Sequence, residues 1–244
     1  MTRTRLVLAG SGEFTPAMDA IDRELLAEIG PGARVAIVPT AAGLEDTPKG
    51  WAAMGSDHFR ALGAEPVALM VLNRADAEDA RWRDLAGTID WFYFSGGDPG
   101  HVVATLAGSP FWSAVLARHE AGALIAGSSA GAMMLGQTTF VPSERGPDGF
   151  PTKVGVRAAL GLVPRALIAP HFDILPPRIL GMWSELVPAD HRLLGIDEDT
   201  ALLQRNGGWE VRGRGRVLVF RTADDRSVYP SGGSALSLAF EPLP

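Results

Sequence analysis

The chain has 244 residues, of which 46% are hydrophobic and 20% charged, a balance typical of a globular protein with one sizeable core. Its formal net charge of −6 argues against nucleic acid as the main partner, because phosphate binding needs a basic surface. The absence of cysteine excludes disulfides, thiolate metal sites and a cysteine nucleophile. No apolar run is long enough for a membrane span or a signal-peptide core, so we expect a cytoplasmic protein without membrane contact.

Short apolar runs alternate with helical patterns along most of the chain. The predicted strands are 6–9, 34–39, 66–72, 91–94, 123–126, 167–169 and 193–196, and the predicted helices are 16–29, 51–62, 99–106 and 110–120. Continuous apolar strands separated by helices predict an α/β fold, with a mostly parallel sheet covered by helices on both faces. We find no linker, and therefore expect a single domain over 1–244 with a C-terminal β-hairpin tail from about residue 206.

The stretch from residue 123 to 136 carries the strongest signal for chemistry. Gly127-Ser128-Ser129-Ala130-Gly131 fits the G-x-S-x-G pattern of a sharp turn from a strand into a helix, with Ser129 at its tip. Such a turn needs small neighbours, and it places the serine oxygen near the unpaired N–H groups of a helix N-terminus. An ordinary Gly/Ser turn is the alternative. The apolar run before it and the helix-forming residues after it favour Ser129 as a nucleophile.

A serine nucleophile needs a neighbouring base. The five histidines are His58, His101, His119, His171 and His191. His171 alone directly follows an apolar strand, at the sheet edge where Ser129 is expected; a buried histidine with satisfied hydrogen bonds is the alternative. His101, shortly after the Gly96-Gly97 turn, is a second candidate, and the other three are expected at the surface or in solvent.

The histidine in turn needs a carboxylate to fix its tautomer. Glu144, Asp173 and Glu198 compete for this role. Asp173 has the His-x-acid spacing of glutamine amidotransferases, Glu198 ends a separate strand, and Glu144 lies in a polar stretch, 142–146, that predicts a mobile loop. An oxyanion needs two N–H donors: the amide of Ala130 supplies one, and the Gly96-Gly97 turn is the best source of the second.

Four short motifs now match a known family in order and approximate spacing. They are F-S-G-G-D at 94–98, G-S-S-A-G-A at 127–132, P-H-F at 170–172 and G-I-D-E-D-T-A at 195–201. Together they resemble the aspartyl dipeptidase and cyanophycinase family of serine peptidases, and the last motif is closer to the cyanophycinase branch. The resemblance implies a class I glutamine amidotransferase-like fold with serine in place of cysteine, and no metal or organic cofactor.

The same resemblance assigns roles to individual residues. It implies a triad of Ser129, His171 and Glu198, with the amides of Gly97 and Ala130 as oxyanion donors. Dipeptidase relatives hold the aspartate of the substrate with an arginine between the catalytic His and Glu. Arg178 and Arg192 lie in that interval, which is shorter here, so neither matches the family position clearly. Gly96, Asp98 and Asp173 are further candidates for contact with the substrate.

We therefore expect a serine peptidase that cleaves a peptide or isopeptide bond in a small Asp-containing substrate through an acyl-enzyme. An esterase or a small-amide hydrolase of a biosynthetic pathway is an alternative, although α/β-hydrolase esterases place the histidine last in the chain order. A non-catalytic binding protein on the same scaffold is another. The expected partner is a small peptide or amide, and a homodimer is one of the assemblies left open.

Overall fold

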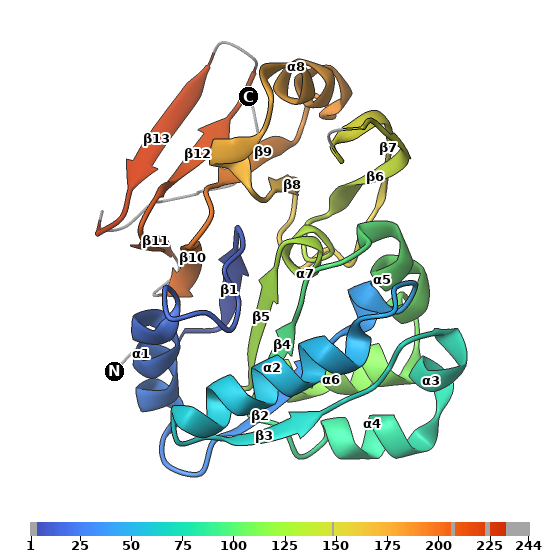
Figure 1. The fold of residues 1–244 in the computed structure, drawn as a ribbon, viewed down its shortest axis with the longest axis vertical. Helices are drawn as coiled ribbons and strands as arrows, with labels where there is room; N and C mark the ends of the chain where they lie inside the picture. The colour runs from blue at the N-terminus through green and yellow to red at the C-terminus, as the bar shows by residue number, and fades with distance from the viewer. Residues whose placement is uncertain (1–3, 148, 206–207, 223–224, 233–244) are drawn as a thin grey trace.

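The computed structural model describes residues 4–147, 149–205, 208–222 and 225–232 (Figure 1). Its centre is a seven-stranded sheet in the order β11-β10-β1-β5-β4-β2-β3. These strands are β11 (Gly208–Gly213), β10 (Thr200–Arg205), β1 (Leu6–Ala9), β5 (Leu124–Ser128), β4 (Trp91–Phe94), β2 (Arg34–Val38) and β3 (Glu65–Ala68). The five from β1 to β3 run parallel, while β10 and β11 are antiparallel at one edge. The expected α/β fold is confirmed.

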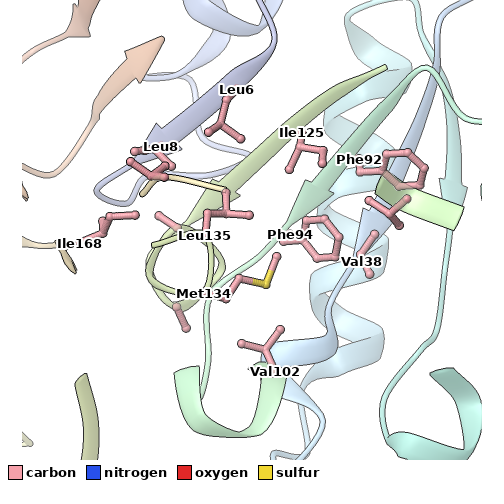
Figure 2. Packing of buried hydrophobic residues seen from close by; sticks show 14 of the residues in the cluster. Leu6, Leu8, Val38, Phe92, Phe94, Val102, Ile125, Met134, Leu135 and Ile168 are labelled. Atoms are coloured by element: carbon pink, nitrogen blue, oxygen red, sulfur yellow. The ribbon is translucent and has the colours of Figure 1, made fainter. Parts of the chain in front are cut away.

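Helices cover both faces of this sheet because its strands are apolar on both sides. Helices α1 (Asp19–Ile29) and α2 (Pro48–Ala61) pack on the face that carries Tyr93. The other face carries Phe92 and Phe94. It is covered by α3 (Arg74–Glu78), α4 (Ala80–Ala86), α5 (Pro99–Leu106) and α6 (Pro110–Glu120). Figure 2 shows these phenylalanines of β4 gathered with Val102 of α5 and with Met134. Side chains that alternate along each strand thus fill two separate cores.

A second sheet lies beside the first and has the order β13-β12-β9-β8. Its strands are β13 (Arg226–Pro230), β12 (Arg216–Phe220), β9 (Arg192–Ile196) and β8 (Ala166–Ala169). The segment after residue 206 is divided between the two sheets. It supplies β11 to the large sheet, and it forms the β12–β13 hairpin, which pairs with β9.

A two-stranded hairpin of β6 (Thr138–Arg145) and β7 (Pro151–Ala158) stands beside α8 (Pro177–Leu186) (Figure 1). The polar stretch 142–146, expected to be a mobile loop, is mostly the last part of β6, so that expectation is wrong. Pairing with β7 satisfies the backbone of β6, and the ring of Phe140 stacks on that of Trp183 in α8 with centroids 4.6 Å apart. Contacts distant in sequence therefore order a segment whose local composition favours a loop.

Within the described ranges, no helix combines the length and the apolar character that crossing a membrane would require.

Candidate active site

Ser129 lies on the turn between β5 and the short helix α7 (Ala130–Met133). Its backbone has a φ of 52° and a ψ of −119°, a strained conformation for a residue with a side chain. A Cβ at Gly127 would lie 2.1 Å from the carbonyl oxygen of Gly131, and one at Gly131 would lie 2.2 Å from that of Phe94. Glycine is thus required on both sides of the serine, as the G-x-S-x-G pattern predicts.

A chain of two hydrogen bonds joins Ser129, His171 and Glu198. Ser129 Oγ lies 2.9 Å from His171 Nε2, and His171 Nδ1 lies 2.8 Å from Glu198 Oε1. His171 follows β8 and Glu198 follows β9, two parallel strands of the second sheet, while Ser129 follows β5 of the first. This network favours the histidine tautomer that carries its proton on Nδ1, donates it to Glu198 and accepts the serine hydroxyl on Nε2.

The two other candidate acids make different contacts. Asp173 lies in the 3-10 turn η2 (Phe172–Ile174), and its Oδ1 accepts a hydrogen bond of 2.8 Å from the backbone N–H of Glu198. Glu144 is exposed on β6, where its Oε1 lies 3.4 Å from Lys153 Nζ. Glu198 is therefore the carboxylate that contacts the histidine, and Asp173 fixes the backbone of that glutamate.

The amides of Gly97 and Ala130 have no hydrogen-bond acceptor within the described parts of the chain. Gly97 has a φ of 140°, and a Cβ there would lie 2.3 Å from the carbonyl oxygen of Ala41, so the turn needs glycine. Gly97 lines the same cavity as Ser129, and Ala130 is the next residue after that serine. Two unpaired N–H groups beside a serine hydroxyl are what an oxyanion site requires.

The neighbouring candidates have partners inside the protein. The N–H of Gly96 donates to Glu13 Oε1 at 3.0 Å. The carboxylate of Asp98 accepts a hydrogen bond from the N–H of His101 at 2.7 Å, and so caps α5.

Glu13 is a site residue whose role the sequence did not reveal. It follows β1, is 6% exposed, and binds both turns that carry the active-site groups. Its Oε1 accepts from the Gly96 N–H, and its Oε2 accepts from the Ser128 hydroxyl at 2.6 Å. Its position just after an apolar strand was the only signal, since nothing in the sequence names its partners.

The histidines other than His171 make contacts away from Ser129. The side chain of His58 is 7% exposed, and its Nε2 lies 2.8 Å from Asp22 Oδ2. Burial of Asp22 raises the pKa of its carboxyl, and the hydrogen bond with His58 offsets part of that rise. His191 is 5% exposed and contacts Asp190 through Nδ1 at 2.8 Å. The expectation that these two lie at the surface or in solvent is wrong, because polar neighbours in sequence do not prevent burial of one side chain.

Ser129 and His171 open onto a cavity of about 340 Å³. Its wall comes mainly from apolar side chains of the β6–β7 hairpin, of α8 and of the loop after His171. Besides His171, the basic residue in the described part of this wall is Arg145, near the tip of the hairpin. The sequence analysis did not identify Arg145 as a site residue. Arg178, in the first turn of α8, and Arg192, at the start of β9, are not among the lining residues. No group of three or more possible metal ligands occurs among the residues that the structure describes.

The fold and this arrangement match a class of peptidases. The family model described as Peptidase family S51 matches residues 6–212, and the chain belongs to this family. This match confirms the expected family. It also confirms the expected class of enzyme, a serine-type peptidase.

Relatives and solved structures agree with this assignment. A cyanophycinase of Geminocystis herdmanii is 27% identical over 218 residues, which cover 88% of this chain and 79% of that protein. A cyanophycinase of Trichormus variabilis is 29% identical over 66% of this chain, which spans only 55% of its length. The crystal structure of a peptidase from an acI-B1 actinobacterium has a TM-score of 0.80 and 30% identity, covering 95% of this chain and 96% of that one. A structure from Listeria monocytogenes EGD-e, with a TM-score of 0.64 and 19% identity over 87% of this chain and 99% of that one, shares the fold.

Proposed function

We propose that this chain is a serine peptidase that hydrolyses a peptide or isopeptide bond in a small substrate through an acyl-enzyme. The observation that supports it is the hydrogen-bonded chain from Ser129 through His171 to Glu198, beside two unpaired amides. Membership of peptidase family S51 supports the reaction class. An Asp-containing substrate is suggested by the family resemblance. The cavity itself, with a mainly apolar wall and Arg145, instead supports a substrate with an apolar side chain and a carboxylate.

In the first half of the proposed reaction, His171 Nε2 takes the proton of Ser129 as Oγ attacks the scissile carbonyl carbon. The negative charge that develops on the carbonyl oxygen is held by the N–H groups of Gly97 and Ala130. Glu198 stays ionised, keeps the imidazole ring oriented and stabilises the imidazolium. His171 then gives the proton to the leaving amine, and the acyl group remains on Ser129.

In the second half, a water molecule takes the place of the leaving amine. His171 Nε2 removes one proton from this water as its oxygen attacks the acyl carbon, and the same two amides hold the second oxyanion. The bond to Ser129 Oγ breaks, His171 returns its proton to that oxygen, and the carboxylic acid product leaves. Over one cycle the proton of Ser129 leaves with the amine and is replaced by a proton from water, and no step of this proposal uses a cofactor.

The test is to label and to delete the nucleophile. A fluorophosphonate should react with wild-type protein at Ser129, as located by mass mapping of the adduct. On a panel of Asp-X, β-Asp-X and unrelated peptides and esters, Ser129→Ala should lower turnover of the best substrate by about a million-fold, the cost typical of nucleophile removal. Ser113→Ala, on the exposed side of α6, is the matched control and should behave as wild type. An adduct on another residue, or Ser129→Ala with more than about a tenth of wild-type activity, would contradict the proposal.

A further inference from the structure

We propose that the cavity beside Ser129 takes a dipeptide-sized substrate with an apolar side chain next to the scissile bond and a carboxylate that binds Arg145. This inference rests on the proposed function, because it assigns the substrate class of the same site. Neither Arg178 nor Arg192 has this role in the proposal, since neither lines the cavity.

An irregularity in the β6–β7 hairpin brings Arg145 to the cavity. Side chains of a regular strand alternate, so Pro142, which lines the cavity, would share its face with Glu144. The pairing with β7 shifts in register between Pro142 and Glu144 and again between Glu144 and Arg145. As a result, Arg145 lines the cavity, while Glu144 contacts Lys153 at the exposed surface. Bulges next to active sites commonly redirect a side chain in this way. Here the bulge places a cation on the cavity wall instead of a carboxylate.

Among the described residues, a hydrogen-bond partner holds the guanidinium of Arg145 at one nitrogen. Its Nη1 donates to the carbonyl oxygen of Gly149 at 3.0 Å, which fixes one side of the group against the hairpin loop. No carboxylate forms an ion pair with it among the residues that the structure describes. A guanidinium has five N–H donors in a planar fork, and it binds a carboxylate through two parallel hydrogen bonds. Arg145 therefore retains the donors that such a contact needs.

The rest of the wall is apolar. Met133, Phe150, Leu175 and Trp183 contribute large side chains, and the stacking of Trp183 on Phe140 ties this wall to the base of the hairpin. No described lining residue carries a carboxylate. An arginine or lysine side chain of a substrate would lose water there without gaining a partner, whereas an apolar side chain would gain contact area. The wall thus favours an apolar group next to the scissile bond.

The size of the cavity suits a small substrate. Ligand sites for small molecules range over about 300–1,000 Å³, and this cavity of about 340 Å³ lies at the small end. It has room for about one large side chain and the backbone beside it. In a dipeptide, the free C-terminal carboxylate and the scissile carbonyl are close enough for both to bind in this one cavity.

The experiment measures the binding of peptides to the Ser129→Ala protein, which should not cleave them, by calorimetry. The probes are leucylphenylalanine, its C-terminal amide and leucylarginine. We expect the Kd of leucylphenylalanine to be about tenfold or more below that of either other peptide, the effect of one well-placed charge-assisted pair. In Ser129→Ala/Arg145→Gln the preference for the acid over the amide should disappear. The matched control is Ser129→Ala/Arg157→Gln, which removes an exposed arginine of β7 that does not line the cavity, and it should keep that preference.

Three results would overturn the inference: equal affinity for acid and amide, equal effects of the Arg145 and Arg157 changes, or no binding of any of the three peptides. Tight binding of leucylarginine would contradict the apolar part. Fluorophosphonate labelling of Ser129 in the wild-type protein reports on the proposed function without involving Arg145. If Ser129 is labelled but the acid is not preferred, the inference fails alone. If the acid is preferred but Ser129 is not labelled, the proposed function fails alone.

Discussion

The carboxylate on His171 Nδ1 belongs to Glu198, and Asp173 contacts the backbone of that glutamate. Both residues therefore affect the histidine, but by different physical means. Glu198 acts through charge and through the proton on Nδ1, whereas Asp173 holds one backbone N–H in place. The geometry thus separates two acids that local spacing alone left in competition.

This difference predicts an ordered set of effects. Glu198→Gln should lower turnover by roughly three to four orders of magnitude, because a neutral amide does not stabilise the imidazolium and its NH₂ group can hold the wrong tautomer. Asp173→Asn should cost about tenfold or less, since its amide oxygen can still accept the Glu198 N–H. Glu144→Gln, at the exposed pair with Lys153, is the control and should match wild type. All three are measured on one substrate. If Asp173→Asn were the inactive variant and Glu198→Gln nearly wild-type, the acid would be Asp173.

At the scale of elements, the buried carboxylate of Glu13 clamps two turns of the large sheet. One turn follows β4 and carries Gly97, and the other follows β5 and carries Ser129. Because Glu13 binds Gly96 and Ser128, it fixes the distance between the turn with the proposed oxyanion donor Gly97 and the turn with the proposed nucleophile Ser129. We assign it as a positioning residue.

Glu13→Ala should slow the labelling of Ser129 by a fluorophosphonate about 10- to 100-fold, because displacing an oxyanion donor costs part of the roughly 100- to 1,000-fold loss caused by removing one. Glu13→Gln should retain most of the rate: its amide oxygen can accept the Gly96 N–H while its NH₂ group donates to Ser128 Oγ. The assay should also give kcat and KM on a peptide substrate, and we expect the loss in kcat. A purely structural role would instead lower the unfolding midpoint of Glu13→Ala and leave the rate of the folded protein unchanged.

Elements with strong local signals could be predicted from the sequence. The strand at 91–94 and the helices at 99–106 and 110–120 agree with the structure, because Pro at the first turn and the caps Asp98 and Ser109 mark the helix starts locally. The sharp turn at Ser129 was also predictable, because its glycines and the apolar run before it are local signals. The β6–β7 hairpin was not, since its register and bulge depend on pairing and on the Phe140–Trp183 stack. The position of Arg145 on the cavity wall was not predictable either, because it depends on the bulge in this hairpin.

At the scale of the whole molecule, the candidate site lies where the two sheets meet. Ser129 and the amides of Gly97 and Ala130 follow strands of the large sheet, while His171 and Glu198 follow strands of the second sheet. The chain passes from one sheet to the other between β9 and β10, and Glu198 lies in this short connection. Docking of the sheets therefore sets the distance of 2.9 Å between Ser129 Oγ and His171 Nε2. Sequence motifs could name these residues, but their meeting depends on tertiary packing.

A charged network lies at the opposite end of the large sheet. Arg205, whose side chain is 10% exposed, is the last residue of β10 and binds Thr4, Glu24, Glu28 and Glu210. Since Gln204 pairs with Leu6, this network lies at the amino end of β1, whereas Ser129 follows the carboxyl end of β5. It ties the start of the described chain to α1, β10 and β11, and it does so away from the chemistry.

Arg205→Met should therefore lower stability without changing the chemistry. Among the described residues, it leaves Glu28 without a cation, while Glu24 and Glu210 keep Arg212. We expect a loss of about 2 kcal/mol, or roughly 4–8 °C in the unfolding midpoint of a chain of this size. Thermal unfolding measures this. Arg60→Met is the matched control, because Arg60 and Asp57 form an exposed pair whose loss should cost under about 0.5 kcal/mol. Well below the midpoint, both variants should label Ser129 at the wild-type rate. A slower rate in Arg205→Met alone would mean that this network helps to hold the sheets in register at the site, so that stability and catalysis would not be separable between the two ends of the sheet.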